Sequence, residues 1–390
     1  MNYAHRKGKQ TIKVGGPNKK VMVKQLRHKF LFGCSEFSVL PYVNGEMNAA
    51  EAAAAEKRYD YMTELLNFVT LPFYWGRYEP EQGKPDTARM AAAAKYLKAR
   101  GMTLKGHPLC WHTVCAPWLL EMSNADILKT QLERVKRDVA GFEGLIDMWD
   151  VINEAVIMPL FNKYDNAMTR LCKEKGRIKL IRELFNEARS ASKNATLLIN
   201  DFETSESYDI LIEGLLEAGV EIDAIGIQSH MHQGYWGIEK TEEILERFSR
   251  FNLPLHFTEI TLVSGDIMPR HIVDLNDWQV DDWPSTPEGE ARQAEEAVNY
   301  YAKLFSYPLV ESITWWSFMD GLWLNAPAGI LDKNSAPKPV YHALHEKIKG
   351  EWWMSEKEFV SDENGFVTVE GFKGDYLAVC DGQEVKFSIS

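Results

Sequence analysis

Two glutamates, Glu154 and Glu259, stand near the ends of two short segments that could carry chemistry. Residues 149–155 (WDVINEA) and 256–260 (HFTEI) are both rich in apolar and β-branched side chains. Such runs are typical of buried parallel strands. Glycoside hydrolysis needs two carboxyl groups, one to protonate the leaving oxygen and one to attack the sugar or activate water. The pair therefore predicts a glycosidase, with Glu154 as the general acid and Glu259 as the nucleophile.

The neighbours of the two glutamates make this interpretation more specific. A lone glutamate is more commonly a surface or salt-bridged residue, but here Asn-Glu ends one run and Thr-Glu ends another. The amide of Asn153 could hold the sugar 2-hydroxyl, a contact that strengthens in the transition state. Two carboxyls across a small site repel each other, so one is expected to stay protonated while the other is ionised.

Strand-like runs alternate with helix-like stretches along most of the chain. The expected strands end near Phe37, Phe73, Leu109, Asn153, Asn200, Ser229, Glu259 and Phe318. The expected helices cover 46–66, 86–100, 124–142, 166–193, 205–218, 240–250 and 288–306. This alternation predicts an α/β fold, a closed (β/α)8 TIM barrel, in which residues at the carboxyl ends of the strands meet at one mouth. An open doubly wound sheet is the alternative, but no Gly-rich phosphate loop follows any strand.

The two ends of the chain differ in character from the middle. Residues 11–28 predict two short strands around a Gly-Gly-Pro-Asn turn, and residues 351–390 contain short alternating runs separated by glycines. So short a C-terminal segment is marginal for a core of its own. We therefore expect the N-terminal strands of residues 1–28 to join it in a small accessory β-sheet beside a barrel of residues 29–350. A carbohydrate-binding module with its own aromatic surface is the less favoured alternative for residues 351–390.

Composition narrows the classes of function. The 390 residues include 44 Lys and Arg against 56 Asp and Glu, a formal net charge of −12. Such a chain is a poor candidate for binding nucleic acid or an anionic membrane. The 12 Trp and 15 Tyr could offer flat faces to sugars, although most aromatic residues belong in a core. The five cysteines lack C-x-x-C spacing, so neither a zinc site nor a disulfide framework is expected.

Nothing in the sequence fixes a cellular compartment. No stretch is long and apolar enough to span a membrane. The first ten residues, MNYAHRKGKQ, are basic, but no apolar core follows them, so no signal peptide is visible. A cytoplasmic location and an exported protein whose signal has been removed both stay open.

Seven segments, in order, resemble the motifs of glycoside hydrolase family 10, whose best-known members are endo-β-1,4-xylanases. They are 106–112 (GHPLCWH), 149–155, 199–202 (INDF), 223–231 (DAIGIQSHM), 257–260 (FTEI), 315–320 (WWSFMD) and 331–341. The resemblance extends from about Phe30 to Leu344. It implies a retaining barrel enzyme, an O-glycosyl hydrolase that cleaves β-1,4-linked xylan or a related β-glycan by double displacement.

The resemblance also implies roles for individual residues. It implies that the −1 sugar, whose bond is cleaved, contacts His107, Trp111, Asn153 and Gln228, with Trp316 beneath it and Trp323 near a lid. It further implies a hydrogen bond between His230 and Glu259. His107, His112, His230 and His232 could instead suggest a metal site, but no further acid stands at ligand spacing. We expect neutral orienting histidines and neither a metal nor a cofactor.

One segment departs from the family pattern. Xylanases of the family carry Glu-Asn-x-Met-Lys-Trp on the second strand, and its Asn and Lys bind hydroxyls of the −1 sugar. This chain reads TLPFYW over residues 70–75, with Leu71 at the Asn position and Tyr74 at the Lys position. Loss of one neutral hydrogen bond costs about 0.5–1.5 kcal/mol, and more if the donor is charged. Tyr74 is therefore a candidate substrate contact, and the preferred sugar or its decoration is expected to differ.

Two alternatives to a xylanase stay open. An exo-acting or decorated-glycan β-glycosidase is suggested by Leu71, Tyr74 and the long insert at 261–287, which could shape the site or be an ordinary surface loop. A non-catalytic glycan-binding protein is less favoured, since it needs no acid and nucleophile together. The expected partner is a polysaccharide or oligosaccharide substrate, and the sequence predicts no oligomeric state.

Overall fold

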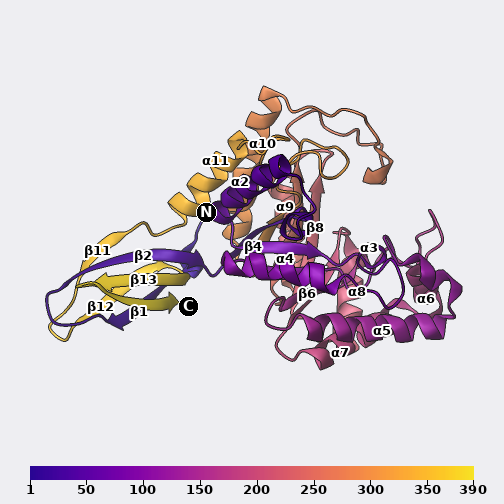
Figure 1. Ribbon diagram of the computed structural model, residues 1–390, viewed down its shortest axis with the longest axis horizontal. Helices are drawn as coiled ribbons and strands as arrows, with labels where there is room; N and C mark the ends of the chain where they lie inside the picture. The colour runs from indigo at the N-terminus through magenta and orange to yellow at the C-terminus, as the bar shows by residue number, and fades with distance from the viewer.

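Most of the chain forms a closed barrel of eight parallel strands (Figure 1), seen in a computed structural model that describes residues 1–390. In order around the barrel the strands are β10 (Val310–Trp315), β3 (Leu31–Ser35), β4 (Phe68–Pro72), β5 (Thr103–His107), β6 (Met148–Asn153), β7 (Thr196–Asp201), β8 (Ala224–Met231) and β9 (Leu255–Leu262). Strand β10 closes the barrel because it pairs with both β3 and β9. The predicted (β/α)8 fold is confirmed, and the open doubly wound sheet is wrong.

Helices connect the strands. They are α1 (Val39–Val43), α2 (Ala49–Leu65), α3 (Trp75–Tyr78), α4 (Thr87–Ala99), α5 (Asn124–Gly141), α6 (Ala167–Lys175), α7 (Arg177–Ala191), α8 (Glu206–Glu217), α9 (Gly237–Ser249), α10 (Pro287–Phe305) and α11 (Pro339–His345). Side-chain caps set several starts: Asn48 and Ser123 accept hydrogen bonds from backbone N–H groups of the first turns of α2 and α5. No helix has the combination of length and apolar character that a membrane crossing would need.

The prediction of one helix over 166–193 is wrong. Gly176 lies between α6 and α7 with a φ of 81°. Glycine adopts this conformation at little cost, whereas other residues rarely do, and the positive φ ends α6. The glycine was visible in the sequence, but the apolar period continues through it. Two helices therefore replace the expected one.

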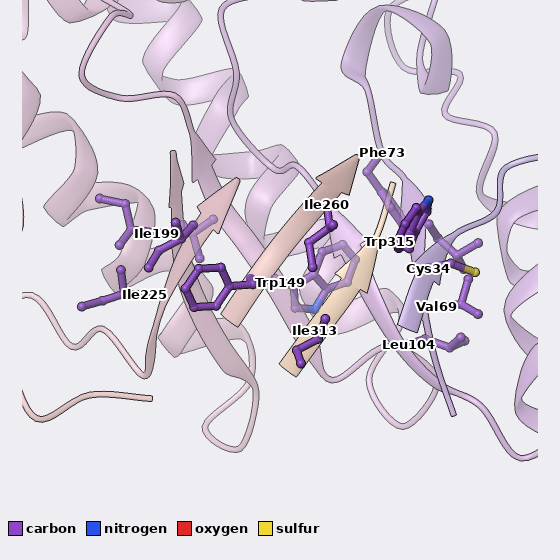
Figure 2. Close-up of a cluster of buried hydrophobic side chains, with 14 of the residues drawn as sticks. Cys34, Val69, Phe73, Leu104, Trp149, Ile199, Ile225, Ile260, Ile313 and Trp315 are labelled. Atoms are coloured by element: carbon purple, nitrogen blue, oxygen red, sulfur yellow. The ribbon is translucent and has the colours of Figure 1, made fainter. Parts of the chain in front are cut away.

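The main apolar core lies between the strands and the surrounding helices. Figure 2 shows members of this core, among them Trp149 and Trp315, which are fully buried and lie beside Phe142, after α5, and Tyr301 of α10. Two close approaches require glycine: a Cβ on Gly106 would lie 2.1 Å from the ring of Trp149, and a Cβ on Gly226 would lie 2.4 Å from Oδ1 of Asn200. These glycines let bulky or polar neighbours lie flat against strands β5 and β8.

Strands from both chain ends pair beside the barrel, as predicted. Strand order in the larger sheet is β11 (Lys357–Val360), β2 (Lys20–His28), β13 (Gly374–Cys380) and β14 (Gln383–Ile389). The remaining strands, β1 (Lys7–Lys13) and β12 (Phe366–Phe372), form a separate pair. The expectation of a single sheet is therefore wrong in detail. Strand β12 pairs with β1 and not with β11 or β13, the strands next to it in the sequence. The division into 1–28, 29–350 and 351–390 stays a prediction.

Opposite charges favour this pairing of the two chain ends. Residues 1–29 contain lysines and arginines but no acidic residue, whereas residues 351–390 are predominantly acidic. Three exposed ion pairs join the strands: Lys9–Glu370 (2.9 Å), Lys19–Asp381 (2.9 Å) and Lys20–Glu358 (3.2 Å). Each exposed pair contributes little, so the apolar core between the sheets supplies most of the stability.

Aromatic side chains dock the accessory strands onto the amino-terminal end of the barrel, away from Glu154 and Glu259. Trp352 is fully buried and stacks on Phe305 with ring centroids 4.5 Å apart. Arg6 donates hydrogen bonds to the carbonyl oxygens of residues 305, 307 and 310. Phe372 and Tyr376 are also buried. Trp352, Phe372 and Tyr376 are therefore not available to bind sugars at the surface. Their burial favours the interpretation that the accessory strands brace the barrel.

We predict that Trp352→Ala lowers the free energy of unfolding by about 3–5 kcal/mol, because it leaves a cavity beside Phe305. Urea unfolding followed by circular dichroism measures this change. The matched control is Phe366→Ala in β12, a residue that is 37% exposed, with a smaller expected change of about 1–2 kcal/mol. Equal stability of Trp352→Ala and the parent protein would contradict the bracing role.

Candidate active site

Glu154 follows directly after β6 in a turn held by the next strand. Its φ is 55°, in the left-handed region that non-glycine residues seldom adopt. Residues held in this conformation cluster at functional sites. The backbone N–H of Glu154 donates to the carbonyl oxygen of Asn200 (2.8 Å), and that of Val156 donates to Oδ2 of Asp201 (3.0 Å). The end of β7 therefore fixes the turn that presents the Glu154 carboxyl group.

Three side-chain amides connect Glu154 to Glu259, which lies on β9. Oδ1 of Asn153 accepts hydrogen bonds from Nδ2 of Asn200 (2.8 Å) and Nε2 of Gln228 (3.1 Å). Asn200 also donates to Oε1 of Glu259 (2.8 Å), and Gln228 donates to Oε1 of Glu154 (3.3 Å). Four neighbouring strands, β6 to β9, thus hold the two carboxyl groups in a fixed relation.

Glu259 is surrounded by groups that favour its ionised form. Nε2 of His230 lies 3.0 Å from Oε2, and Nε2 of His107 lies 4.0 Å from Oε1. Burial raises the pKa of Glu259, but the hydrogen bond from His230 and the electrostatic effect of nearby His107 and Lys105 outweigh it and hold that pKa below its ordinary value. Glu259 is therefore ionised at neutral pH.

The buried carboxylate of Asp150, paired with Lys105, orients His107. Oδ2 of Asp150 lies 2.7 Å from Nδ1 of His107 and 2.7 Å from Nζ of Lys105, and all three side chains are buried. Burial raises the pKa of Asp150, but Lys105 and His107 together lower it below its ordinary value. Because an ionised carboxylate only accepts hydrogen bonds, Nδ1 of His107 must be the donor. This leaves Nε2 of the imidazole facing Glu259.

Glu154 has the opposite electrostatic environment. Burial raises the pKa of Glu154 to about 8; the hydrogen bond from Nε1 of Trp111 (2.8 Å) opposes this, and the negative charges of Asp201 and Glu259 add to it. His112 lies 3.9 Å away but supplies no charge at neutral pH, since burial lowers its pKa to about 4. Glu154 therefore stays protonated at neutral pH.

Aromatic rings surround the carboxyl groups. The ring of Trp316 lies edge-on to His107 at 5.5 Å, and that of Tyr74 lies 5.5 Å from Trp111. Trp323 approaches His230 at 4.6 Å. The ten residues predicted for the site gather at this one mouth: Tyr74, His107, Trp111, Asn153, Glu154, Gln228, His230, Glu259, Trp316 and Trp323. Their individual roles stay predictions.

Sequence reasoning missed four residues that position the site. Asn200 and Asp201 lie in one of the matched segments, and two polar residues at the end of a buried strand are a usable signal for such a role. Lys105 was also visible as a lone charge in an apolar run. Its partner, Asp150, could not be paired with it from sequence, because the two residues come from different strands.

A parallel eight-stranded barrel whose mouth holds one protonated and one ionised carboxyl group is an arrangement used by glycoside hydrolases. The fold and the site define that class. Within it, the sequence profile of Glycosyl hydrolase family 10 matches residues 41–347. The chain therefore belongs to this family and is an O-glycosyl hydrolase, which confirms the resemblance and the enzyme class predicted from the sequence.

Known relatives agree with this assignment. Endo-1,4-beta-xylanase B of Thermotoga neapolitana is 28% identical over 317 residues, which cover 76% of this chain and 84% of the relative. Endo-1,4-beta-xylanase A of Caldicellulosiruptor saccharolyticus is 24% identical over 261 residues, 62% of this chain and 71% of that protein. The crystal structure of xylanase 10B from Thermotoga petrophila RKU-1 in complex with xylobiose is 22% identical, with a TM-score of 0.66 over 82% of this chain and 95% of that one. This last likeness shows a shared fold.

Proposed function

We propose that this enzyme hydrolyses β-1,4-linked xylan or a closely related β-glycan by a retaining double displacement. The observation that carries the proposal is the opposite shift of two pKa values at one mouth, raised for Glu154 and lowered for Glu259. The similarity to endo-1,4-beta-xylanases, and to a xylanase solved with xylobiose, supports xylan as the substrate.

In the first step, ionised Glu259 attacks the anomeric carbon while protonated Glu154 gives its proton to the leaving oxygen. The glycosidic bond breaks, and a covalent bond joins the sugar to Glu259. The hydrogen bonds from Asn200 and His230 hold the attacking carboxylate in one orientation before the reaction.

In the second step, Glu154 acts as a base. The negative charge of Glu259 contributes to the raised pKa of Glu154, so the loss of that charge in the covalent intermediate lowers the pKa of Glu154. Ionised Glu154 then takes a proton from water, and the water oxygen displaces Glu259 from the anomeric carbon. The net result is hydrolysis with retained configuration.

Tyr74 favours a second candidate, a related β-glycosidase with a different −1 sugar or a decorated chain. Burial, and then the charge of Glu259, raise the pKa of Tyr74 well above its ordinary value, so it offers a neutral hydroxyl where the family has a charged lysine. Leu71 is fully buried in β4 and offers no donor. The −1 sugar would thus meet fewer and weaker donors on this side.

The acid–base roles predict a bell-shaped pH dependence of kcat/KM on an unactivated oligosaccharide. Activity falls on the alkaline side as Glu154 loses its proton near its pKa of about 8, and on the acidic side as Glu259 gains one below its ordinary range. Glu154→Gln should lower kcat by about 10²–10⁴-fold and abolish the alkaline limb. Exposed Glu356→Gln is the matched control and should leave the profile unchanged. An alkaline limb that survives in Glu154→Gln would contradict the acid role.

The substrate is tested by incubation with xylan, arabinoxylan, glucuronoxylan and mixed-linkage glucan, with reducing sugar and product size followed over time. We expect xylo-oligosaccharides from at least one xylan and no measurable turnover by Glu259→Ala. Hydrolysis of only a non-xylan glycan would favour the second candidate. Binding without turnover by the parent protein would favour the non-catalytic alternative.

Tyr74→Phe then tests the specificity argument. If the hydroxyl contacts the −1 sugar, its removal should lower kcat/KM on the preferred glycan by about 2–13-fold, the equivalent of 0.5–1.5 kcal/mol. Tyr307→Phe, at the opposite end of the barrel, is the control and should show no loss.

A further inference from the structure

The insert between β9 and α10, residues 263–286, is a folded segment. Its apolar side chains form a small core with the loop after β10, made of Val263, Met268, Trp283, Ala326 and Ala328. Nε1 of Trp283 donates to the carbonyl oxygen of Asp266 (2.9 Å), and a short 3₁₀ turn, Leu275–Asp277, lies near the middle of the insert. So much internal packing is unusual for an ordinary surface loop.

One lysine joins this insert to the loop that follows Glu154. Nζ of Lys163 lies 2.5 Å from Oδ2 of Asp274 and 2.7 Å from Oδ1 of Asp277. The backbone N–H of Asn276 also donates to Asp274 (2.9 Å), which fixes the carboxylate at the start of the 3₁₀ turn. We call this set of contacts the Lys163 bridge.

The order of strands places the bridge over one side of the mouth. Lys163 belongs to the loop between β6 and α6, whereas Asp274 and Asp277 belong to the loop between β9 and α10. Strands β7 and β8 separate β6 from β9 around the barrel. The two loops therefore meet across the carboxyl ends of β7 and β8, where Figure 1 shows the orange insert extending toward the segment before α6.

Each end of the bridge leads back to a catalytic carboxyl group. On the side of β6, the ring of Phe161 lies 4.6 Å from that of His112, and Nε2 of His112 is 3.9 Å from Oε2 of Glu154. Tyr164 packs on Phe161 with ring centroids 4.8 Å apart. The loop that carries Lys163 is thus held close to the proposed acid.

The insert is held close to the proposed nucleophile in the same way. Oδ1 of Asn276 accepts a hydrogen bond from Nε1 of Trp323 (3.4 Å), and the ring of Trp323 lies 4.6 Å from that of His230. His230 in turn bonds to Glu259. Contacts therefore run from one carboxyl group to the other through the bridge.

The side that the bridge covers is the side of the leaving group. Three of the proposed −1 contacts, Tyr74, His107 and Trp316, follow or end β4, β5 and β10, on the other side of the barrel. The other three, Trp111, Asn153 and Gln228, bond to Glu154 between the two sides. The −1 sugar would lie among them. The leaving group, which receives its proton from Glu154, would then extend away from them toward β7 and β8 and the bridge.

We propose that the Lys163 bridge limits the length of the leaving group to one or two sugars, so that the enzyme cuts near the reducing ends of its chains. In a β-1,4 glycan the leaving group carries the reducing end, and a covered site on that side cannot accept a long continuation of the chain. The inference rests on the proposed function and adds the position of the cut to it.

The test compares the parent protein with Lys163→Met, which keeps an unbranched side chain and removes the charge. Each is incubated with xylotriose to xylohexaose labelled at the reducing end, and with soluble xylan in a viscometer. The parent should cut mainly one or two sugars from the labelled end and lower viscosity slowly for each new reducing end. Lys163→Met should cut further from the label. For each bond cut, its effect on viscosity should be about threefold or more that of the parent protein.

Two controls separate the bridge from general damage. Lys20→Met removes an exposed ion-paired lysine in the accessory sheet and should reproduce the parent pattern. An aryl xyloside has a leaving group smaller than a disaccharide, so the bridge should not restrict it. Its turnover should change less than about twofold in Lys163→Met. Asp274→Asn combined with Asp277→Asn should act like Lys163→Met, since it removes the other half of the bridge.

The outcomes distinguish the two proposals. Hydrolysis of the xylo-oligosaccharides with the same cutting positions in the parent and Lys163→Met would overturn the bridge proposal and leave the proposed function intact. A parent protein that cuts xylohexaose at its centre would do the same. A parent protein that hydrolyses none of these substrates would overturn the proposed function and, with it, the bridge.

Discussion

Two carboxyl groups that share one water-poor mouth cannot both carry a charge at neutral pH without a large cost, and the rest of the site is arranged around this constraint. Burial alone would raise both pKa values. The difference comes from the neighbours. Glu259 receives hydrogen bonds from Asn200 and His230 beside a buried lysine, whereas Glu154 is bonded by the neutral groups of Trp111, Asn153 and Gln228 and faces other carboxylates. One group therefore holds a proton while the other is ionised, as the proposed mechanism requires.

The barrel satisfies this constraint because it brings single residues from many strands to one place. The amide chain from Glu154 to Glu259 uses four adjacent strands, and it depends on backbone positions that only glycine allows, such as Gly226 beside Asn200. The accessory sheets lie at the other end of the barrel, where Trp352 packs on Phe305. The accessory sheets and the proposed site thus lie at opposite ends of the same strands.

The sequence predicted what depends on local pattern and on motif. The alternation of apolar runs gave the barrel, and the glutamates at two strand ends gave the proposed catalytic pair. Contacts between distant, individually ordinary residues were not predictable: nothing in the sequence pairs Lys105 with Asp150, or Lys163 with Asp274. The pairing of β12 with β1 was missed for the same reason, since strand order within a small sheet depends on long-range packing. The end of α6 at Gly176 is not predictable from the apolar pattern, because the period typical of a helix continues on both sides of the glycine.

The most direct test of the account is the protonation state of the two carboxyl groups, measured by NMR titration of 13C-labelled glutamate side chains and assigned with Glu154→Gln and Glu259→Gln. We expect that at pH 7 the Glu154 carboxyl is protonated, with a pKa of about 8, while that of Glu259 is ionised. We also expect that Glu259→Gln lowers the pKa of Glu154, because a negative charge is removed beside it. Two carboxyl groups that are both ionised at pH 7 would contradict the account.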